Sequence, residues 1–401
     1  MSPQRKDRAC NNDKRKTVLV FMGTRPEAIK LAPVVWAMRK CPKAFKVKIC
    51  STGQHRQMLD QALSEFNLKP DIDLSVMRPS QSLADLSSQL YAAIDNVLAR
   101  EAPDWVVVQG DTTTVMVASL CAFYKGIQVA HVEAGLRTFD KLAPFPEEVN
   151  RRIVTLVADL NFAPTKIAKG NLLREGVRSR SIVVTGNTVV DALRWMNTLI
   201  ANSPPPLPSV IERAIQLERK IVLITGHRRE SFGSGLKEIC LAIKDLAHKH
   251  PSVLFVYPVH LNPSVQKPVH QLLQTVTGVV LTAPLSYKPF LYLMRKSHLV
   301  VTDSGGIQEE SASMGKPVLV TREVTERPEG VLAGVSRLVG TSRQRIVTEV
   351  SRILTSQSAY VRMSRKTPEY GNGRAAERIV RSLMAWPTKG VRPARSRRIA
   401  Q

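Results

Sequence analysis

Three carboxylates stand at or beyond the ends of apolar segments that have the composition of buried strands. Asp111 follows Trp105–Gln109, Glu133 follows Gln128–Val132, and Glu147 comes fourteen residues after Glu133. Carboxylates gathered in one place raise one another's pKa values, which suits general acid–base catalysis. They could instead bind a divalent metal, or lie solvated on separate loops. Read alone, Asp111 is better explained as the N-cap of the next helix.

Basic residues suited to phosphate follow two other apolar segments. Arg25 would project from a turn between a strand and a helix that starts at about Pro26, and His227 is followed by Arg228 and Arg229. Guanidinium groups bind phosphate oxygens, and an imidazole can protonate a leaving group. A surface arginine and a structural histidine are the plainer alternatives.

A glycine-rich turn offers a second phosphate-binding element. The apolar segment Leu299–Thr302 runs into Ser304, Gly305 and Gly306, and a helical pattern follows. Backbone N–H groups at such a turn can approach a diphosphate, and the positive end of the helix favours its charge. Glu310, one turn into the helix, could accept hydrogen bonds from ribose hydroxyls. The alternative is a turn followed by an acidic first helical turn.

The elements that must position these residues are strands alternating with helices. Continuous apolar strands separated by helical patterns predict buried parallel sheets, whose ligands bind at the carboxyl ends of the strands. The expected strands are 17–22, 47–51, 105–109, 128–132, 181–185, 221–225, 253–259, 279–283, 299–302 and 318–321.

A proline-rich stretch divides this series of elements. Four of the five residues 204–208 are prolines, which a helix or a central strand does not tolerate. The sequence therefore predicts an α/β fold with two doubly wound, Rossmann-like domains facing across a cleft, which is the default ligand site. The expected divisions are a basic disordered tail at 1–16, a domain at 17–200, a linker at 201–209, a domain at 210–383 and a second basic disordered tail at 384–401.

The charge of the chain narrows the class of protein only in part. Its 401 residues hold 58 Lys and Arg against 33 Asp and Glu, a net charge of +25. Such an excess favours anionic partners. A nucleic-acid binder is disfavoured because aromatic residues make up only 5% and no binding motif occurs.

No apolar run is long enough for membrane insertion, and no secretory signal opens the chain. Five scattered cysteines without a CxxC pair favour reduced thiols in a cytoplasmic protein.

Taken together, the segments from residue 17 to 383 resemble the non-hydrolysing UDP-N-acetylglucosamine 2-epimerases. Hydrolysing relatives usually lack the GTRPE form that is present here. The matching motifs, in chain order, are GTRPEAIK (23–30), GQHRQMLDQ (53–61), GDTTT (110–114), HVEAGLRT (131–138), FPEEVNR (145–151), GNTVVDAL (186–193), TGHRRESFG (225–233), YPVHLNP (257–263), TDSGGIQEE (302–310) and TERPE (325–329).

The resemblance implies a fold and a reaction. The fold is two Rossmann-like domains of the glycosyltransferase GT-B type, in which the last helix can pack back on the N-terminal domain. The reaction is reversible inversion at C2 of UDP-N-acetylglucosamine to give UDP-N-acetylmannosamine. It proceeds by elimination of UDP to enzyme-bound 2-acetamidoglucal and re-addition of UDP. The resemblance also implies a homodimer, and neither a cofactor nor a required metal.

The same resemblance assigns roles to individual residues. Asp111, Glu133 and Glu147 match the catalytic carboxylates of the family, and His227 matches a histidine that assists departure of UDP. Other positions match nucleotide-binding residues, and Phe290 among them matches an aromatic that contacts uracil: these are Arg25, Lys30, Phe290, Ser304, Gly305, Gly306 and Glu310.

The resemblance leaves regulation and three other readings open. Gln54, His55 and Gln57 match part of a site that binds a second, activating UDP-N-acetylglucosamine in some members, but Ser80 replaces an arginine of activated members. The alternatives are a hydrolysing epimerase that releases N-acetylmannosamine, a GT-B glycosyltransferase and a catalytically silent UDP-sugar-binding protein. The presence of all three carboxylates and the histidine disfavours the silent protein.

Overall fold

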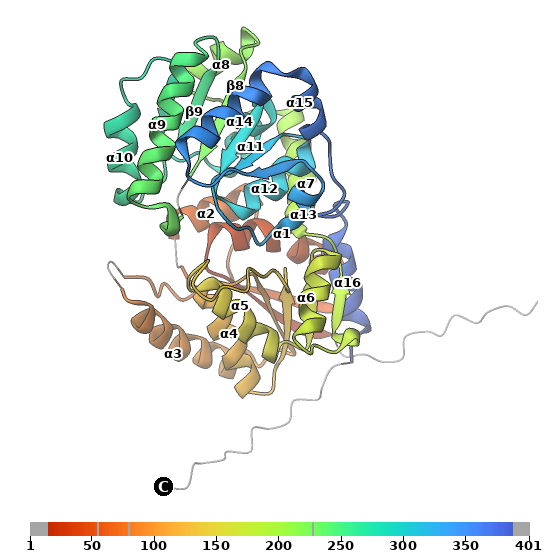
Figure 1. Cartoon of the computed structure of the whole chain (residues 1–401). Coiled ribbons are helices and arrows are strands. Elements are labelled where there is room, and N and C mark those ends of the chain that lie inside the picture. Colours follow the sequence, from red (N-terminus) through yellow and green to blue (C-terminus); the bar gives the residue numbers. More distant parts are fainter. Residues whose placement is uncertain (1–14, 54–55, 79–80, 227, 388–401) are drawn as a thin grey trace, which may run out of the picture.

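The computed structural model describes residues 15–53, 56–78, 81–226 and 228–387. They form two lobes, each built on a parallel sheet, with the first sheet in the lower lobe of Figure 1 and the second in the upper lobe. The strand order is β3-β2-β1-β4-β5-β6-β7 in the first sheet and β10-β9-β8-β11-β12-β13 in the second. Both orders reverse beside the first strand of the sheet, which is the arrangement of a doubly wound α/β fold.

The strands of the first sheet are β1 (Lys16–Met22), β2 (Phe45–Ser51), β3 (Ile72–Asp73), β4 (Trp105–Gln109), β5 (Gln128–Val132), β6 (Leu160–Ala163) and β7 (Ile182–Val184). Those of the second sheet are β8 (Ile221–Thr225), β9 (Leu254–Pro258), β10 (Val279–Thr282), β11 (Leu299–Thr302), β12 (Val318–Val320) and β13 (Ser336–Leu338). Every strand expected from the sequence overlaps an observed one. The strands that sequence reasoning missed are β3, β6 and β13, which are short and, in β6 and β13, interrupted by a polar residue.

The helices cover both faces of the sheets. They are α1 (Arg25–Arg39), α2 (Arg56–Glu65), α3 (Leu83–Glu101), α4 (Thr113–Tyr124), α5 (Glu147–Val157), α6 (Lys166–Arg174), α7 (Thr188–Asn202), α8 (Ser209–Gln216), α9 (Ser234–Lys249), α10 (Pro263–Leu273), α11 (Tyr287–Lys296), α12 (Gly305–Met314), α13 (Pro328–Leu332), α14 (Arg343–Thr355), α15 (Gln357–Met363) and α16 (Ala375–Ala385). Short 3-10 turns lie at Ser179–Ser181 and Arg229–Ser231.

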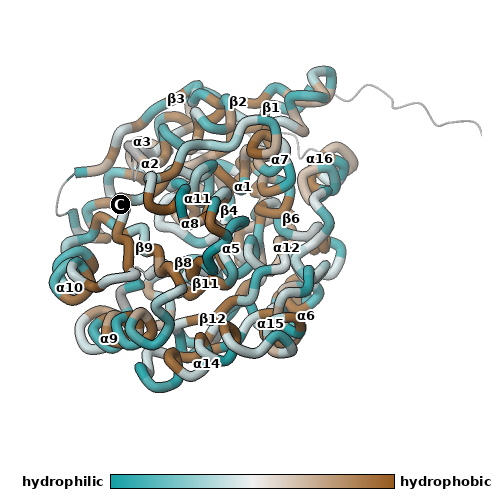
Figure 2. The backbone as a smooth tube through the Cα atoms, turned by 90° about the horizontal axis from the view of Figure 1, so that it is seen from above, coloured by the Kyte–Doolittle hydropathy of each residue, from teal (hydrophilic) through white to brown (hydrophobic). Residues whose placement is uncertain are grey.

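Apolar strands form the interior of each lobe. In Figure 2 the strands β8, β11 and β12 are brown and lie inside the ring of helices. In β4 all residues from Trp105 to Gln109 are buried. This burial explains why the strands read as continuous apolar runs rather than as alternating ones. Among the described residues, no helix is long and apolar enough to cross a membrane.

Two helices join the lobes. Helix α7 packs against α1 and α16 on one side and against α11 and α12 on the other. Helix α16, the last one, lies in the lower lobe of Figure 1 and packs against α1. Lys16 fixes its end, because Nζ donates hydrogen bonds to the carbonyl oxygens of Leu383 at 2.9 Å, Met384 at 3.1 Å and Trp386 at 2.6 Å. Helix α7 thus contacts helices of both lobes.

The domain divisions 17–200, 201–209 and 210–383 stay predictions, as α7 serves both lobes. Ordered structure reaches into the segments expected as tails, since Lys16 belongs to β1 and α16 ends at Ala385. Residues 1–14 and 388–401 lie outside the described residues.

Candidate active site

Adjacent strands β4 and β5 bring the first two carboxylates together. Asp111 and Glu133 follow these strands, and Gln109 pairs with Val132 at their ends. His131 connects the two segments, with Nε2 2.8 Å from the carbonyl oxygen of Gly110. Burial lowers the pKa of His131 to about 4. The ring is therefore neutral and donates this hydrogen bond, which holds the backbone just before Asp111.

Asp111 is an ion-pair partner and not a helix cap. Thr112 caps α4 and accepts a hydrogen bond from the Val115 N–H at 3.3 Å, so the N-cap interpretation of Asp111 is wrong. The Asp111 carboxylate pairs with Arg151, which is buried. Burial alone would raise the pKa of Asp111, but the charge and hydrogen bond of Arg151 outweigh it and hold the pKa below its ordinary value. Asp111 is therefore ionised.

Glu147, the first residue of α5, has the opposite tendency. Its burial and the nearby charge of Asp111 raise its pKa. Its Oε2 atom is buried and has no hydrogen-bond partner among the described residues. A carboxyl group in this state holds its proton more tightly than an exposed one and suits proton donation.

Glu133 lies in a group of side chains that comes from both lobes. Its Oε2 is 2.5 Å from Nζ of Lys30 in α1, and its Oε1 is 3.1 Å from Nη2 of Arg327, which precedes α13. The amide of Asn187, the N-cap of α7, donates to Oε2 at 3.1 Å. All of these side chains are buried. The residue itself has a φ of 65°, an unusual conformation for a residue other than glycine, and such conformations cluster at functional sites.

Glu309, in α12, completes this group. Its Oε1 accepts hydrogen bonds from Nε of Arg327 at 3.1 Å and from Asn187 at 2.9 Å, and its Oε2 lies 3.8 Å from Nζ of Lys30. Burial raises the pKa of Glu309 to about 7, although Arg327 and Lys30 oppose the shift. Two cations and two carboxylates thus share one buried space between the lobes.

The glycine-rich turn lies against Arg327, and the nucleotide-binding roles expected for Ser304, Gly305 and Gly306 stay predictions. A Cβ atom on Gly305 would lie 2.2 Å from Nη1 of Arg327, so this glycine leaves room for the guanidinium group. A Cβ on Gly306 would meet nothing within 4 Å among the described residues. Ser304 is the N-cap of α12 and makes no side-chain capping bond. The N–H groups of this helix start therefore suit a phosphate group.

Arg25 and Glu310 lie near each other on the other side of α12. Arg25 Nη1 donates to the carbonyl oxygen of Leu285 at 3.0 Å, and the charge of Glu310 acts on Arg25. Burial raises the pKa of Glu310 to about 7, and its Oε1 accepts a hydrogen bond from the Tyr287 hydroxyl at 2.7 Å. Phe290, in α11, is 8% exposed and packs in the hydrophobic core. Its expected contact with uracil stays a prediction.

The structure does not test the roles expected for four of the site residues. His227, Gln54 and His55 lie outside the described residues, and Gln57 belongs to α2. The roles predicted for these four residues stay predictions. The described residues contain no group of three or more His, Cys, Asp or Glu that could hold a metal ion.

Arginines surround the loop that contains His227. Glu326 is buried between Arg322 at 2.6 Å and Arg327 at 2.5 Å, and Arg228 lies 3.8 Å away. Burial alone would raise the pKa of Glu326, but these arginines hold it well below its ordinary value. Three guanidinium groups thus gather around one carboxylate, and guanidinium groups are suited to bind phosphate oxygens.

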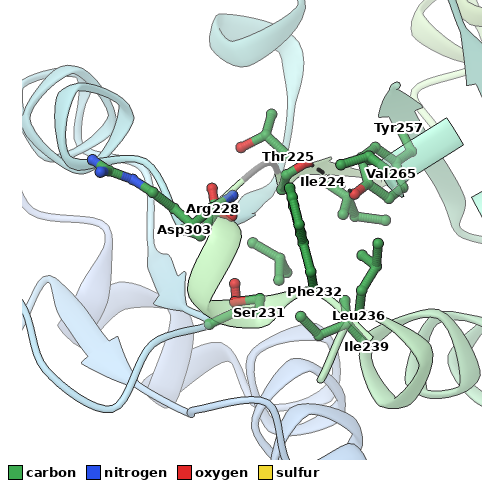
Figure 3. Close-up of a pocket in the computed structure, with 13 residues that line it drawn as sticks. Ile224, Thr225, Arg228, Ser231, Phe232, Leu236, Ile239, Tyr257, Val265 and Asp303 are labelled. Carbon is green, nitrogen blue, oxygen red and sulfur yellow. Dashed lines mark hydrogen bonds between the residues drawn. The ribbon is translucent and has the colours of Figure 1, made fainter. Parts of the chain in front are cut away.

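Figure 3 shows the cavity beside this loop. Phe232 and Leu236 face Tyr257 across it, and Asp303 accepts a hydrogen bond from the Arg228 N–H at 2.8 Å. The cavity measures about 10 Å³, room for about one water molecule. It is too small for a nucleotide sugar.

Sequence reasoning missed several residues of this site. Asn187, Arg151, Glu309, Glu326 and Arg327 all lie within segments quoted above for the family resemblance. Asn187 follows the expected strand 181–185 and could have been found by the rule that pointed to Asp111, whereas the other four residues are recognised only by their partners in the folded structure.

The comparisons with known proteins agree with this geometry. The family model described as UDP-N-acetylglucosamine 2-epimerase matches residues 38–384. The UDP-N-acetylglucosamine 2-epimerase of Escherichia coli K12 is 50% identical over 368 residues, which are 91% of this chain and 98% of that protein. The crystal structure of UDP-GlcNAc 2-epimerase from Neisseria meningitidis bound to UDP-GlcNAc superposes with a TM-score of 0.87 at 45% identity, covering 92% of this chain and 99% of that one.

A more distant structure shows the fold alone. The glycosyltransferase of kitacinnamycin matches with a TM-score of 0.61 at 13% identity, covering 92% of this chain and all of that one. The architecture is therefore the α/β, GT-B arrangement of two Rossmann-like lobes. With a family model matching most of its length and relatives at half identity, the chain belongs to the UDP-N-acetylglucosamine 2-epimerase family.

Proposed function

We propose that this chain catalyses the reversible conversion of UDP-N-acetylglucosamine to UDP-N-acetylmannosamine. A base removes the C2 proton, the C1–O bond breaks, and UDP leaves with the bonding electrons to give 2-acetamidoglucal. UDP then returns to C1 while a proton is delivered to the other face of C2. The supporting observation is Glu133, a buried carboxylate placed between Lys30 and Arg327.

The carboxylates divide the proton transfers between them. Glu133 is fixed in position by Lys30 and Arg327, and we assign it the role of the base. Glu147 has a raised pKa and an oxygen without a hydrogen-bond partner among the residues that the structure describes, which suits the donor. In the reverse reaction the two exchange roles. Asp111 keeps a negative charge beside Glu147 and so contributes to the raised pKa of Glu147.

The diphosphate gains negative charge as UDP departs, so it needs positively charged groups nearby. We place it at the N-terminus of α12, within reach of Lys30 and Arg327. His227 would supply the proton to the leaving oxygen, and Arg25 and Glu310 would hold the nucleoside. The basis for Arg25 and Glu310 is their proximity to each other beside Tyr287.

Deuterium exchange tests this proposal directly. The protein is incubated with UDP-N-acetylglucosamine in D2O, and the sugar is followed by NMR. We expect deuterium at C2 and an equilibrium mixture of two UDP-sugars. Free N-acetylmannosamine as the main product would assign the chain to hydrolysis instead. A sugar that stays protonated at C2 would overturn the elimination mechanism.

The proposed oligomer is a homodimer formed through α4 and α5. These helices pack together and expose apolar side chains, with Leu156 83% and Tyr124 69% exposed. Large apolar side chains exposed on neighbouring helices are typical of an interface. Leu156→Lys should give a monomer in light scattering. The control, Leu332→Lys, changes a leucine that is 76% exposed in the other lobe and should leave the dimer intact. A monomeric wild type would contradict the proposal.

The proposed compartment is the cytoplasm. Cys41, Cys50, Cys121 and Cys240 are free thiols, as is usual in reducing compartments. Fractionation of cells that produce the chain would test this, and recovery outside the cytoplasm would contradict it.

A further inference from the structure

One neutral side chain contacts both buried carboxylates of the central group. Asn187 Nδ2 donates to Oε2 of Glu133 at 3.1 Å and to Oε1 of Glu309 at 2.9 Å. Glu133 comes from the first lobe and Glu309 from the second. The amide therefore fixes the position of one carboxylate relative to the other.

The orientation of this amide is set by its own backbone. Asn187 Oδ1 accepts a hydrogen bond from the Val189 N–H at 3.0 Å, which makes Asn187 the N-cap of α7. The Asn187 N–H donates to the carbonyl oxygen of Tyr370 at 2.7 Å. Because the amide oxygen is used by the helix, the NH₂ group must face the carboxylates. The reverse orientation would place an oxygen against two carboxylate oxygens.

Glu309 supports the amide and a cation at once. The same oxygen that accepts from Asn187 also accepts from Nε of Arg327. Arg327 in turn donates to the other oxygen of Glu133. Glu309, Asn187, Glu133 and Arg327 thus form a closed ring of hydrogen bonds, and each member is at least nine-tenths buried.

The neutral donor and the cations respond differently to a bound diphosphate. Lys30 and Arg327 would then have a second anion to pair with, so their contacts with Glu133 would weaken. Asn187 carries no charge and gains nothing from the phosphate. It therefore keeps its hydrogen bond to Glu133 in the loaded site.

We propose that Asn187, supported by Glu309, is the positioning residue that keeps Glu133 aimed at C2 once the diphosphate occupies the two cations. This inference rests on the function proposed above. It concerns turnover and not the affinity for the nucleotide, because Asn187 contacts the carboxylate and not the cations.

The test compares turnover with nucleotide binding in Asn187→Ser. Serine also caps helices, so the start of α7 is preserved while the amide donor is lost. We expect kcat to fall about tenfold to a hundredfold, the effect of losing one hydrogen bond to a charged group. KM for UDP-N-acetylglucosamine, Kd for UDP and Tm should stay within about threefold and a few degrees of wild type. Asn187→Asp keeps the cap but sets a third carboxylate beside the two, and should lose more activity than Asn187→Ser.

A second pair of variants tests the support from Glu309. Glu309→Gln keeps an oxygen that can accept from both Asn187 and Arg327, and it should retain most of the turnover. Glu309→Ala removes the acceptor and should lower kcat as Asn187→Ser does. The matched control is Asn262→Ser, which changes another asparagine cap, whose Oδ1 accepts from the Ser264 N–H at 2.9 Å, at the start of α10.

The outcomes separate this inference from the proposed function. A wild type without deuterium uptake at C2 overturns the function itself. An active wild type with an Asn187→Ser variant of unchanged kcat overturns only the positioning role. Losses of kcat, UDP affinity and Tm in parallel would show that Asn187 serves the fold. If the Asn187 variants do not fold, equal turnover of Glu309→Gln and Glu309→Ala overturns the inference.

Discussion

Two pairs of carboxylates stand in this site, and their surroundings differ in kind. Asp111 and Glu147 lie on the first lobe alone, and the Asp111 side chain is 28% exposed. Arg151 pairs with Asp111, and within the described part of the chain a buried oxygen of Glu147 has no hydrogen-bond partner. Glu133 and Glu309 lie between the lobes, are fully buried or nearly so, and share two cations and an amide.

The difference in charged partners explains which carboxylates have a raised pKa. The first pair is unevenly neutralised: burial and the charge of Asp111 raise the pKa of Glu147, while Arg151 keeps Asp111 ionised. In the second pair Glu133 has a partner on each oxygen. Burial raises the pKa of its neighbour Glu309 to about 7. A protein can thus give two carboxylates different pKa values by giving them different partners.

The largest expected effect is that of Glu133→Gln. An amide cannot take a proton from C2, so kcat should fall by about 10⁴-fold, the upper end for a general base. NMR of deuterium uptake at C2 measures this loss. Near-normal exchange would show that Glu133 is not the base.

A surface carboxylate serves as the control for that variant. Asp95 is paired with Lys125 at 2.8 Å, and its side chain is 55% exposed. Asp95→Asn should leave turnover unchanged.

Glu147→Gln should have the next largest effect. If the protonated Glu147 is the donor, kcat falls by about 10²- to 10³-fold, because the amide has no acidic proton. In the wild type, activity should decline as pH rises through the raised pKa of Glu147, where the proton is lost. The pH–rate profile should lose this alkaline decline in the variant. A wild-type and a variant profile of the same shape would assign the decline to another group.

Gly305→Ala should disturb the second pair and leave the first intact. The new Cβ would overlap the Arg327 guanidinium, which must move away from Glu133. Loss of one charge-assisted contact should weaken UDP binding about tenfold, as measured by calorimetry. In an Arg327→Ala background the same change should cost little more, because the clashing group is gone. Additive losses would contradict this cause.

The smallest expected effect concerns pH and stability. Glu310 has a folded-state pKa of about 7 against an ordinary 4.5, so its protonation stabilises the unliganded fold below about pH 4.5, and this contribution is lost as pH rises through 7. Glu310→Gln cannot ionise and keeps an acceptor for Tyr287. Its Tm should therefore rise relative to that of wild type between pH 5 and pH 8, by a few degrees.

The comparison of the two Tm values is needed because other groups titrate in the same range. Burial lowers the pKa values of His131 and His298 to about 4, which makes stability increase with pH up to about 6.5. That trend is common to both proteins and cancels in the difference. A difference that does not change with pH would show that Glu310 has an ordinary pKa.

Many residues of the site could be predicted from the sequence because they follow the ends of predicted strands. The apolar runs before Asp111, Glu133 and Ser304 are β4, β5 and β11, as predicted. Side chains after parallel strands meet at one edge of a sheet, so composition alone indicated where chemistry would gather. The same reasoning could not recognise Asp111 as an ion-pair partner, since Arg151 stands forty residues away in the middle of α5.

The sequence by itself determined the family and the two parallel sheets and singled out the carboxylates proposed as catalytic, because buried strands and motifs are local patterns. Only the tertiary structure decided what each carboxylate contacts. Asn187 and Glu309 are 122 residues apart and Glu133 and Arg327 are 194 apart, yet they meet in one buried space. Protonation depends on burial and on neighbouring charge, and both are set by packing between the lobes rather than by spacing along the chain.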